Sequence, residues 1–518
     1  MRGKKRPAQG RGRRWAKAGA IICFLIAVVI TVLTVWYVNN FDTSLAGLLY
    51  SLTIPQKGTG TGAVIGPAKQ VAPWIILIFC IYLLLLFLFS EKLWKRIGSR
   101  LRNEDEETGK GKKQRLETIR RRAETALTAA GIASLIVSLI YSAITLDLPD
   151  YLQRLGSQTK IYEQEYAAPE SSRLTAPEDR PNLIMIYLES METTYASSEE
   201  GGIQPVNYMP GLTRLAHENI SFSNSDRLGG IRSTNNTNWT MAALFASTSG
   251  LPFAFPVEQN AMVKYAAFAP EIVTLGDILE EQGYTQEFLC GSDGEYGGRA
   301  LYFREHGSYG IYDLWKAREE GDIPQDYYVW WGFEDRILFR IAKNELTRLE
   351  KSEEPFNLTL LTVDAHHLGG FVCEECGDEY DDPTANVIAC TDRQVTEFVE
   401  WCSRQPFWDN TVLVITGDHP RMDTCLTEGV SFQDRTVYNC FMNARKEPES
   451  GTQFRESTMM DMYPTVLSAM GWEIEGDRLG LGTDLFSGTE TLAERIGYET
   501  LNDETQKYSS YFMNHFAR

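Results

Sequence analysis

Three long apolar stretches without a charged residue most constrain what this chain can fold into. They lie at about 18–38, 73–90 and 126–146. Each is close to the roughly 20 residues that an α-helix needs to cross a bilayer. The first is too long for a signal peptide, and the third is rich in Ala, Gly and Ser, which suit packing between membrane helices. We therefore predict a membrane domain over residues 1–146 with three uncleaved transmembrane helices.

The basic residues around these stretches predict their orientation. Residues 1–17 hold eight Lys and Arg residues and residues 91–123 hold twelve, whereas the loop 39–72 holds only Lys57 and Lys69. By the positive-inside rule, the N-terminus and the 91–123 loop are cytoplasmic. Three spans then place everything after about Asp147 outside. We expect a multi-pass protein of the plasma or inner membrane with a large extracytoplasmic domain.

The net charge of -19 hides a division of the chain. Residues 1–145 carry a charge of +14, and residues 146–518 carry -33. A nucleic-acid-binding protein needs a basic footprint, and here the only basic clusters flank membrane spans. We therefore expect a membrane partner and no nucleic acid.

Beyond residue 181, short apolar runs alternate with helical patterns. Strands are predicted at 183–189, 285–291, 356–364 and 411–418, and helices at 209–218, 240–249, 272–283, 387–404 and 457–470. This alternation predicts an α/β domain over residues 182–518 with a mostly parallel sheet flanked by helices. The Pro-containing polar segment 147–181 is predicted to be a connector. In open α/β sheets, the functional site lies beyond the carboxyl ends of the strands.

Carboxylates and imidazoles stand at the ends of three of these predicted strands. They are Glu189, His366, His367, Asp418 and His419. Two carboxylates and one imidazole, from Glu189, Asp418 and His419, suit a divalent cation such as Mn²⁺ or Zn²⁺. The sequence therefore predicts a metal site at this edge of the sheet.

A polar segment, Ser233 to Thr240, precedes the apolar helical run at 241–247. A hydroxyl at the start of that helix lies near the positive end of the helix dipole. A neighbouring metal would lower the pKa of the hydroxyl and prepare it for attack on phosphorus. Thr240 is the candidate nucleophile, and Thr237 is an alternative.

Seven of the nine cysteines lie beyond the apolar stretches, and two of them form a C-x-x-C pair at 373–376. Such a pair is compatible with a zinc site or a redox motif. It lacks a second C-x-x-C pair and a surrounding βαβ start. In an extracytoplasmic domain the sequence favours a disulfide from this loop to Cys390.

Ordered motifs between about Asn182 and Phe486 carry a resemblance to a known family. They are PNLIMIYLESMETTY, NWTMAALFASTSGLP, LGDILEEQGY, YGGRALYFREHG, LTVDAHHLGGF, TGDHP and YPTVLSAMGW with LGLGTDLF. The chain resembles the alkaline phosphatase/sulfatase superfamily. Within it, the chain is similar to the lipoteichoic acid synthase-like phosphoglycerol transferases, and most of all to those that modify osmoregulated periplasmic glucans. The resemblance implies a sulfatase-like fold.

The resemblance also implies roles for individual residues. The ligands of one divalent metal ion, Mn²⁺ with Mg²⁺ or Zn²⁺ as alternatives, would be Glu189, Thr240, Asp418 and His419. Thr240 would also be the catalytic nucleophile. The substrate headgroup would be bound by His366 or His367, a choice that stays open, and by Asp293, Tyr296 and Arg299.

The activity implied is transfer of glycerophosphate from phosphatidylglycerol to a glycan or glycolipid acceptor through a phospho-threonine intermediate. Sulfate hydrolysis is disfavoured because no C/S-x-P-x-R motif lies near residue 240. Two alternatives stay open: a phosphoethanolamine transferase or another phosphodiester-cleaving enzyme of this fold, and a catalytically silent membrane sensor or scaffold. The intact set of candidate ligands and nucleophile argues against a silent protein.

Overall fold

The computed structural model describes residues 9–41, 62–90, 93, 106–257, 259–352, 354–367 and 369–517. It divides into two compact units, Met1–Gln153 with Pro256–Glu258, and Arg154–Phe255 with Gln259–Arg518. Parts of the segments 1–17, 39–72 and 91–123, on which the orientation depends, lie outside the described residues. The orientation and the domain boundaries therefore stay predictions.

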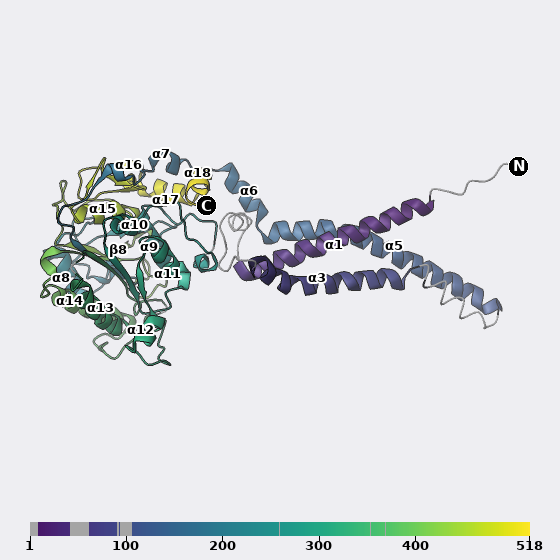
Figure 1. Ribbon diagram of the computed structural model, residues 1–518, viewed down its shortest axis with the longest axis horizontal. Coiled ribbons are helices and arrows are strands. Elements are labelled where there is room, and N and C mark those ends of the chain that lie inside the picture. Colours follow the sequence, from purple (N-terminus) through teal and green to yellow (C-terminus); the bar gives the residue numbers. More distant parts are fainter. Residues whose placement is uncertain are drawn as a thin grey trace. The chain divides into compact units, whose positions relative to one another are not determined.

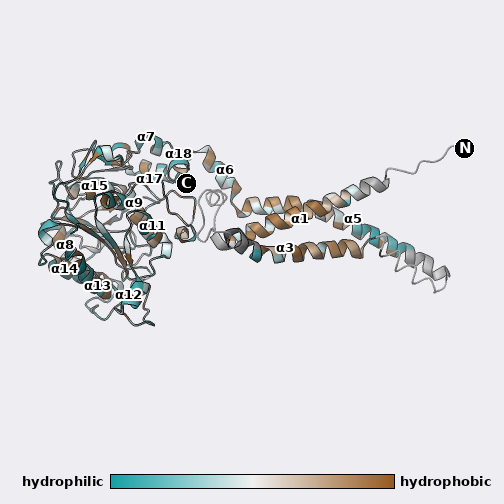
Figure 2. Cartoon of the chain, in the orientation of Figure 1, coloured by the Kyte–Doolittle hydropathy of each residue, from teal (hydrophilic) through white to brown (hydrophobic). Residues whose placement is uncertain are grey.

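The first unit contains three long helices, α1 (Gln9–Phe41), α3 (Gly62–Leu88) and α5 (Glu106–Thr145) (Figure 1). Their segments Trp15–Val38, Lys69–Leu88 and Gln114–Thr145 are each long and apolar enough to cross a membrane. Figure 2 shows the apolar residues along α1, α3 and the C-terminal part of α5. The three apolar helices expected from the sequence are thus present.

Small and hydroxyl-bearing residues join α1 to α5. The Oγ1 atom of Thr31 lies 2.8 Å from Ser138 Oγ, and that of Thr34 lies 2.8 Å from Ser142 Oγ. A Cβ atom added to Gly131 would come within 2.9 Å of the Ala20 carbonyl oxygen, so only glycine permits this approach. Such contacts stabilise helix pairs where apolar burial alone cannot.

The second unit is built on a six-stranded sheet in the order β5-β4-β6-β2-β7-β9. The strands are β2 (Asn182–Leu188), β4 (Thr285–Cys290), β5 (Gly310–Tyr312), β6 (Phe356–Leu361), β7 (Thr411–Gly417) and β9 (Asn439–Met442). All pairs are parallel except β7 with β9. The predicted α/β fold with a mostly parallel sheet is confirmed, and the four predicted strands are neighbours in it.

Helices cover both faces of this sheet (Figure 1). The five predicted helices are present as α8 (Pro210–Glu218), α9 (Thr240–Ser249), α10 (Leu275–Glu281), α14 (Pro383–Cys402) and α15 (Met462–Ala469). Side chains of α8 and α14 share one core with Ile184 and Ile186 of β2. On the other face, Tyr187 of β2 contacts Ser247 of α9 through their hydroxyl groups, 2.7 Å apart.

Several shorter elements, and one long helix, were not anticipated. The long helix is α13 (Asp335–Glu350), whose buried apolar residues recur at helical spacing, a signal that the sequence did contain. The others are α11 (Arg299–Glu305), α12 (Leu314–Glu320), α16 (Leu492–Ile496), α17 (Tyr498–Gln506) and α18 (Ser510–His515). The unit also contains short strand pairs, among them β3 (Ile231–Arg232) with β8 (Thr436–Val437), and β11 (Arg478–Leu479) with β12 (Gly482–Thr483).

The segment expected to be a connector contains α6 (Leu148–Gly156), α7 (Ile161–Glu165) and β1 (Leu174–Thr175). Strand β1 pairs with β10 (Glu473–Ile474), and the buried Tyr162 ring packs edge-on against Phe512 at a centroid distance of 5.1 Å. The latter part of this segment is therefore folded onto the second unit.

Candidate metal and nucleophile site

The carboxyl ends of β2 and β7 bring three candidate ligands together. The two strands run in parallel with Leu188 opposite Gly417, so the residues that follow them emerge side by side. Glu189, Asp418 and His419 are all buried, and one ligand atom from each lies within 4.8 Å of the others. The Nε2 atom of His419 is 3.4 Å from Asp418 Oδ2 and 3.7 Å from Glu189 Oε1.

Thr240 reaches the same point from another element. It is the first residue of α9, and its Oγ1 lies 3.3 Å from Glu189 Oε2 and 3.5 Å from His419 Nε2. The hydroxyl therefore lies at the positive end of the helix, against the three ligands. The Oγ1 of Thr237 instead accepts a hydrogen bond from the Thr234 amide at 2.9 Å, inside its own loop. The geometry thus favours Thr240 over Thr237.

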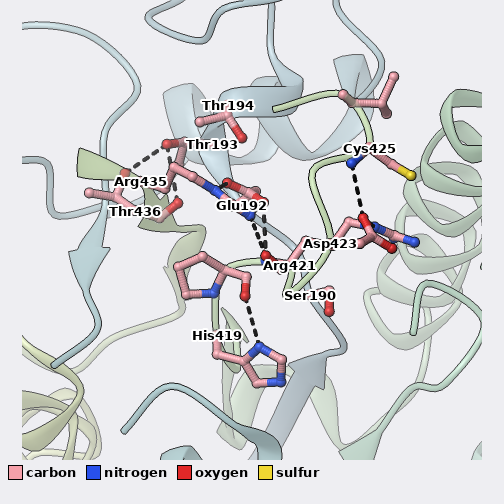
Figure 3. A network of polar contacts seen from close by, with 12 residues as sticks. Ser190, Glu192, Thr193, Thr194, His419, Arg421, Asp423, Cys425, Arg435 and Thr436 are labelled. Atoms are coloured by element: carbon pink, nitrogen blue, oxygen red, sulfur yellow. Dashed lines mark hydrogen bonds and ion pairs between the residues drawn. The ribbon is translucent and has the colours of Figure 1, made fainter. Parts of the chain in front are cut away.

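Hydrogen bonds orient the ligands toward one shared space. The Oδ1 atom of Asp418 accepts from the Ser190 and His419 amides, each at 2.8 Å. Within the described residues, Oδ2 of Asp418 is buried without a hydrogen-bond partner. The Nδ1 of His419 donates to the Pro420 carbonyl oxygen at 2.9 Å (Figure 3), which leaves Nε2 free to ligate. An unpaired carboxylate oxygen, together with an imidazole nitrogen that faces Thr240 and both carboxylates, fits a bound cation.

The charges of this group are mutually dependent. Burial and the negative charge of Glu189 raise the pKa of Asp418 to about 7. Burial opposes ionisation of Glu189 as well, but the neighbouring imidazoles of His419 and His366 lower its pKa below the usual value. Burial opposes the charge on His419, and Asp418 and Glu189 outweigh it and raise its pKa. A divalent cation would remove the repulsion between the two carboxylates.

Ser190 links β2 to this group in a backbone conformation that few residues adopt. Its φ is +54°, in the left-handed region, which costs a residue other than glycine about 1–3 kcal/mol. That conformation lets its amide bind Asp418 while its hydroxyl donates to Glu189 Oε1 at 2.7 Å. The strained turn therefore aligns both carboxylates.

A buried ion-pair network supports the loop after β7 (Figure 3). Glu192 accepts from the Arg421 amide at 3.1 Å and from Arg435 Nε at 2.7 Å, and Arg435 also donates to the Arg421 carbonyl oxygen. The Arg421 guanidinium donates to the Ala365 carbonyl oxygen at 2.7 Å, just before His366. The network ties together the loops that carry the candidate residues. The sequence did not predict this network, although Glu192 lies within one of the recognised motifs and Arg421 directly follows another.

His366 and His367 follow β6 and stack with a ring-centroid distance of 4.3 Å. Both lie close enough to Glu189 to lower its pKa. A ring of Trp331, also missed by the sequence analysis, lies 4.8 Å from His366 and 5.7 Å from Tyr296. The structure thus brings both histidines to the site, and their substrate role stays a prediction.

The remaining candidates, Asp293, Tyr296 and Arg299, form one turn after β4. Arg299 is buried and donates to the carbonyl oxygens of Asp293 and Tyr296, at 2.8 and 3.1 Å. The Asp293 carboxylate accepts from the Glu295 amide at 3.0 Å, and the Tyr296 side chain is 48% exposed. These contacts give each residue a place in the turn. Their role in headgroup binding stays a prediction.

Comparison with known proteins connects this geometry to a family. The family model described as Sulfatase matches residues 181–472. Phosphoglycerol transferase I of Escherichia coli O127:H6 is 31% identical over 342 residues, which cover 64% of this chain and 42% of that protein. Phosphoglycerol transferase I of Salmonella choleraesuis is 31% identical over 330 residues, covering 62% and 41%. The chain thus spans about two fifths of the length of these relatives.

Solved structures of similar proteins include the lipoteichoic acid synthase LtaP from Listeria monocytogenes, with a TM-score of 0.47 and 18% identity over 63% of this chain and 81% of that chain. Another is an alkaline phosphatase superfamily protein from Vibrio parahaemolyticus, with a TM-score of 0.46 and 20% identity over 64% and 76%. The family model alone covers more than half of the 518 residues. The chain belongs to the sulfatase family.

Proposed function

We propose that this protein is a membrane-anchored phosphoglycerol transferase, which moves glycerophosphate from phosphatidylglycerol to a glycan or glycolipid acceptor. The identity to phosphoglycerol transferase I supports the type of group transferred. The observation that carries the proposal is the position of Thr240 Oγ1, 3.3 Å from Glu189 Oε2 at the start of α9. A hydroxyl in this position is a nucleophile placed beside a base and a helix dipole.

The reaction has two displacement steps at one phosphorus atom. Thr240 Oγ1 forms a bond to the phosphorus of phosphatidylglycerol as its proton passes to Glu189, and the bond from phosphorus to the diacylglycerol oxygen breaks. The leaving oxygen takes a proton from the imidazole of His366 or His367. The acceptor hydroxyl then attacks the phospho-threonine and returns its proton to that imidazole, while Thr240 regains its own.

The residues at the strand ends would also hold the metal ion. Glu189, Thr240, Asp418 and His419 would bind one divalent cation, Mn²⁺ by our expectation and Mg²⁺ or Zn²⁺ as alternatives. When bound, it would polarise the phosphoryl oxygens and lower the pKa of the threonine hydroxyl. The α9 amides near Thr240 add positive potential at the same point.

The apolar helices give the enzyme access to a lipid donor. Three helices long enough to span the membrane would keep the sulfatase unit at the surface that presents the phosphatidylglycerol headgroup. The basic segments at 1–17 and 91–123 support a cytoplasmic N-terminus and an extracytoplasmic catalytic unit. Protease digestion of right-side-out vesicles should then cleave the sulfatase unit. Protection of that unit until the vesicles are lysed would reverse the orientation.

The test uses the full chain purified in detergent, with Mn²⁺ and phosphatidylglycerol carrying a ¹³C-labelled glycerol headgroup. We expect diacylglycerol release and a labelled glycerophosphate adduct on the peptide that contains Thr240. The Thr240→Ala variant should form no adduct, whereas Thr237→Ala, the matched control, should form it.

Substituting phosphatidylethanolamine as donor separates the alternatives. An adduct from that lipid alone would indicate a phosphoethanolamine transferase. Neither adduct nor diacylglycerol from either lipid would contradict an enzymatic role and favour the silent sensor or scaffold.

A further inference from the structure

Three cysteines of the sulfatase unit gather in a second cluster of potential ligands. Cys373 and Cys376 lie in the loop after β6, and Cys390 lies on α14. The Sγ atom of Cys373 is 3.8 Å from that of Cys390 and 3.7 Å from that of Cys376, and all three lie within 4.8 Å of one another. The disulfide favoured by the sequence is not formed, because a disulfide bond is about 2.05 Å long.

The spacing of the sulfur atoms matches metal coordination. Zn–S bonds of about 2.3 Å in a tetrahedral site place neighbouring sulfur atoms about 3.8 Å apart. A disulfide would join two of the three sulfurs and leave the third thiol beside it, whereas a metal ion engages all three. Cys373 and Cys390 are buried and Cys376 is half-buried, so the cluster is shielded from bulk solvent.

We propose that Cys373, Cys376 and Cys390 form a zinc site, separate from the group at Glu189, Asp418 and His419. Binding of Zn²⁺ replaces the three thiol protons, which pass to solvent, and no oxidation state changes. The resulting centre carries a net charge of about -1, since three thiolates meet one divalent ion.

Neighbouring residues suit such a centre. Gln394, one turn after Cys390 on α14, has its Nε2 atom 3.2 Å from Cys390 Sγ and can donate to the thiolate. Its Oε1 atom is buried and has no hydrogen-bond partner in the described chain, so it can accept from a water molecule in the fourth position. A cavity of about 300 Å³ lined by Glu375, Cys390, Arg393, Gln394 and Glu397 offers an entry path to the cluster.

The site would anchor the loop that carries the two active-site histidines. In this loop, the Gly370 amide donates to the His366 carbonyl oxygen and the Phe371 amide to that of Asp364, at 3.1 and 2.7 Å. Cys373 lies two residues after Phe371, so a metal joining it to α14 would restrict the imidazoles. This effect on catalysis rests on the proposed transferase function, whereas the zinc site itself does not.

The test measures the metal on the full chain in detergent. We expect bound zinc by elemental analysis and, after exchange with Co²⁺, the near-ultraviolet charge-transfer absorption of cobalt-thiolate bonds. The absorption should persist in Glu189→Gln, because that variant alters only the oxygen and nitrogen ligands. Cys376→Ser and Cys390→Ser should each lose it together with one zinc ion per chain. Cys425→Ser is the matched control, since Cys425 lies outside the cluster, and should retain both.

A measurement on the unmodified chain guards against variants that fail to fold. Alkylation of the native protein should reach these three thiols only after a chelator is added. A cross-linked peptide pair among these cysteines, with the mass of the chain lower by two hydrogens and no cobalt-thiolate absorption, would overturn the proposal in favour of a disulfide. Free alkylation of all three thiols without a chelator would also overturn it.

Discussion

The two ligand clusters of the sulfatase unit differ in chemistry and in how the chain builds them. Glu189, Thr240, Asp418 and His419 come from three distant parts of the sequence. They meet because β2 and β7 are neighbours in the sheet and α9 begins beside the ends of these strands. The three cysteines lie within 18 residues, on one loop and the helix that follows it. Oxygen and nitrogen ligands suit harder cations such as Mn²⁺, and thiolates suit Zn²⁺.

The difference indicates that the two clusters have different roles. The strand-end cluster includes a hydroxyl at a helix N-terminus and faces the two histidines, which is the arrangement of a site for chemistry. The thiol cluster contains candidate ligands but no nucleophile at a helix start, so we expect it to hold a loop in place rather than to catalyse. Variants should therefore affect metal binding at the two clusters independently.

The largest effect is expected at Thr240. Thr240→Ala removes the proposed nucleophile, and diacylglycerol release from phosphatidylglycerol should fall by about 10⁴-fold or more. Thr240→Ser keeps a hydroxyl and should retain measurable turnover, and both variants should keep the cobalt-thiolate absorption. Turnover of Thr240→Ala within tenfold of the native rate would assign the nucleophile elsewhere.

The next largest effect is expected in the buried ion-pair network around Glu192. Glu192→Ala leaves the buried Arg435 guanidinium without its carboxylate and should lower the free energy of unfolding by about 3–5 kcal/mol. The matched control is Glu218→Ala, which breaks an exposed pair with Arg214 and should cost at most about 1 kcal/mol. Denaturant titration of the full chain measures both. Equal costs would show that the Glu192 pair does not hold the loop.

A smaller effect is expected on metal affinity. Asp418→Asn removes one anionic candidate ligand. Loss of a hydrogen-bond partner of a metal ligand weakens metal binding by about 10- to 100-fold, or on the order of 2 kcal/mol. Loss of the ligand itself should weaken Mn²⁺ binding by at least as much. Because burial and Glu189 raise the pKa of Asp418 to about 7, a proton competes with the ion at lower pH, and affinity should rise with pH toward 7.

Calorimetry at several pH values gives both results for Asp418. Cys376→Ser should bind Mn²⁺ as the native chain does. Loss of Mn²⁺ binding in Cys376→Ser would show that the two clusters act as one functional unit.

The last comparison concerns a buried pair of carboxyl groups: Asp364, in the loop that leads from β6 to the cysteines, and Asp335, the first residue of α13. Burial and the neighbouring Asp335 raise the pKa of Asp364 to about 10, so the folded chain keeps a proton that the unfolded chain releases near pH 4. Between these values the folded state binds more protons, and stability falls as pH rises. Asp364→Asn removes this dependence, so its stability relative to the native chain should increase with pH.

Asp335→Asn provides the contrasting variant for this pair. Both carboxylate oxygens of Asp335 accept backbone amides, from Val363 at 2.7 Å and Asp364 at 3.0 Å. An amide side chain has one acceptor oxygen, so one buried N–H loses its partner at a cost of about 1–3 kcal/mol. Denaturant titration between pH 5 and 9 compares the free energy of unfolding of the two variants with that of the native chain. A pH-independent difference between Asp364→Asn and the native chain would exclude the buried proton.

Much of the fold follows from the apolar pattern. Strands β2, β6 and β7 were predictable because each is a short, largely apolar run, and β4 because it ends in the apolar residues Phe288, Leu289 and Cys290. Strand β5 has only three residues, too few to show a period, and β9 is antiparallel at the edge, an arrangement that its sequence does not indicate. Helix α13 showed its period but was overlooked among its many charges.

The candidate site also contains residues that the sequence predicts and residues that it does not. Glu189, Asp418 and His419 were predictable because parallel strands deliver their carboxyl ends to one edge. The network of Glu192, Arg421 and Arg435 was not, because its members pair across up to 243 residues of sequence. Trp331 was also beyond prediction, since it belongs to no motif and meets His366 only through the fold.

By itself, the sequence determined three apolar helices, an α/β sulfatase-family unit and the residue types at its strand ends. The helices and the sheet follow from local periodicity, and the shared edge of the strand ends follows from the fixed direction of parallel strands. The family follows from the ordered motifs by which the chain resembles it. Only the tertiary structure decided that Thr240 rather than Thr237 meets the candidate ligands, and that three cysteines lie at metal-like spacing instead of in a disulfide. Both depend on distances between side chains that packing sets and that sequence separation does not encode.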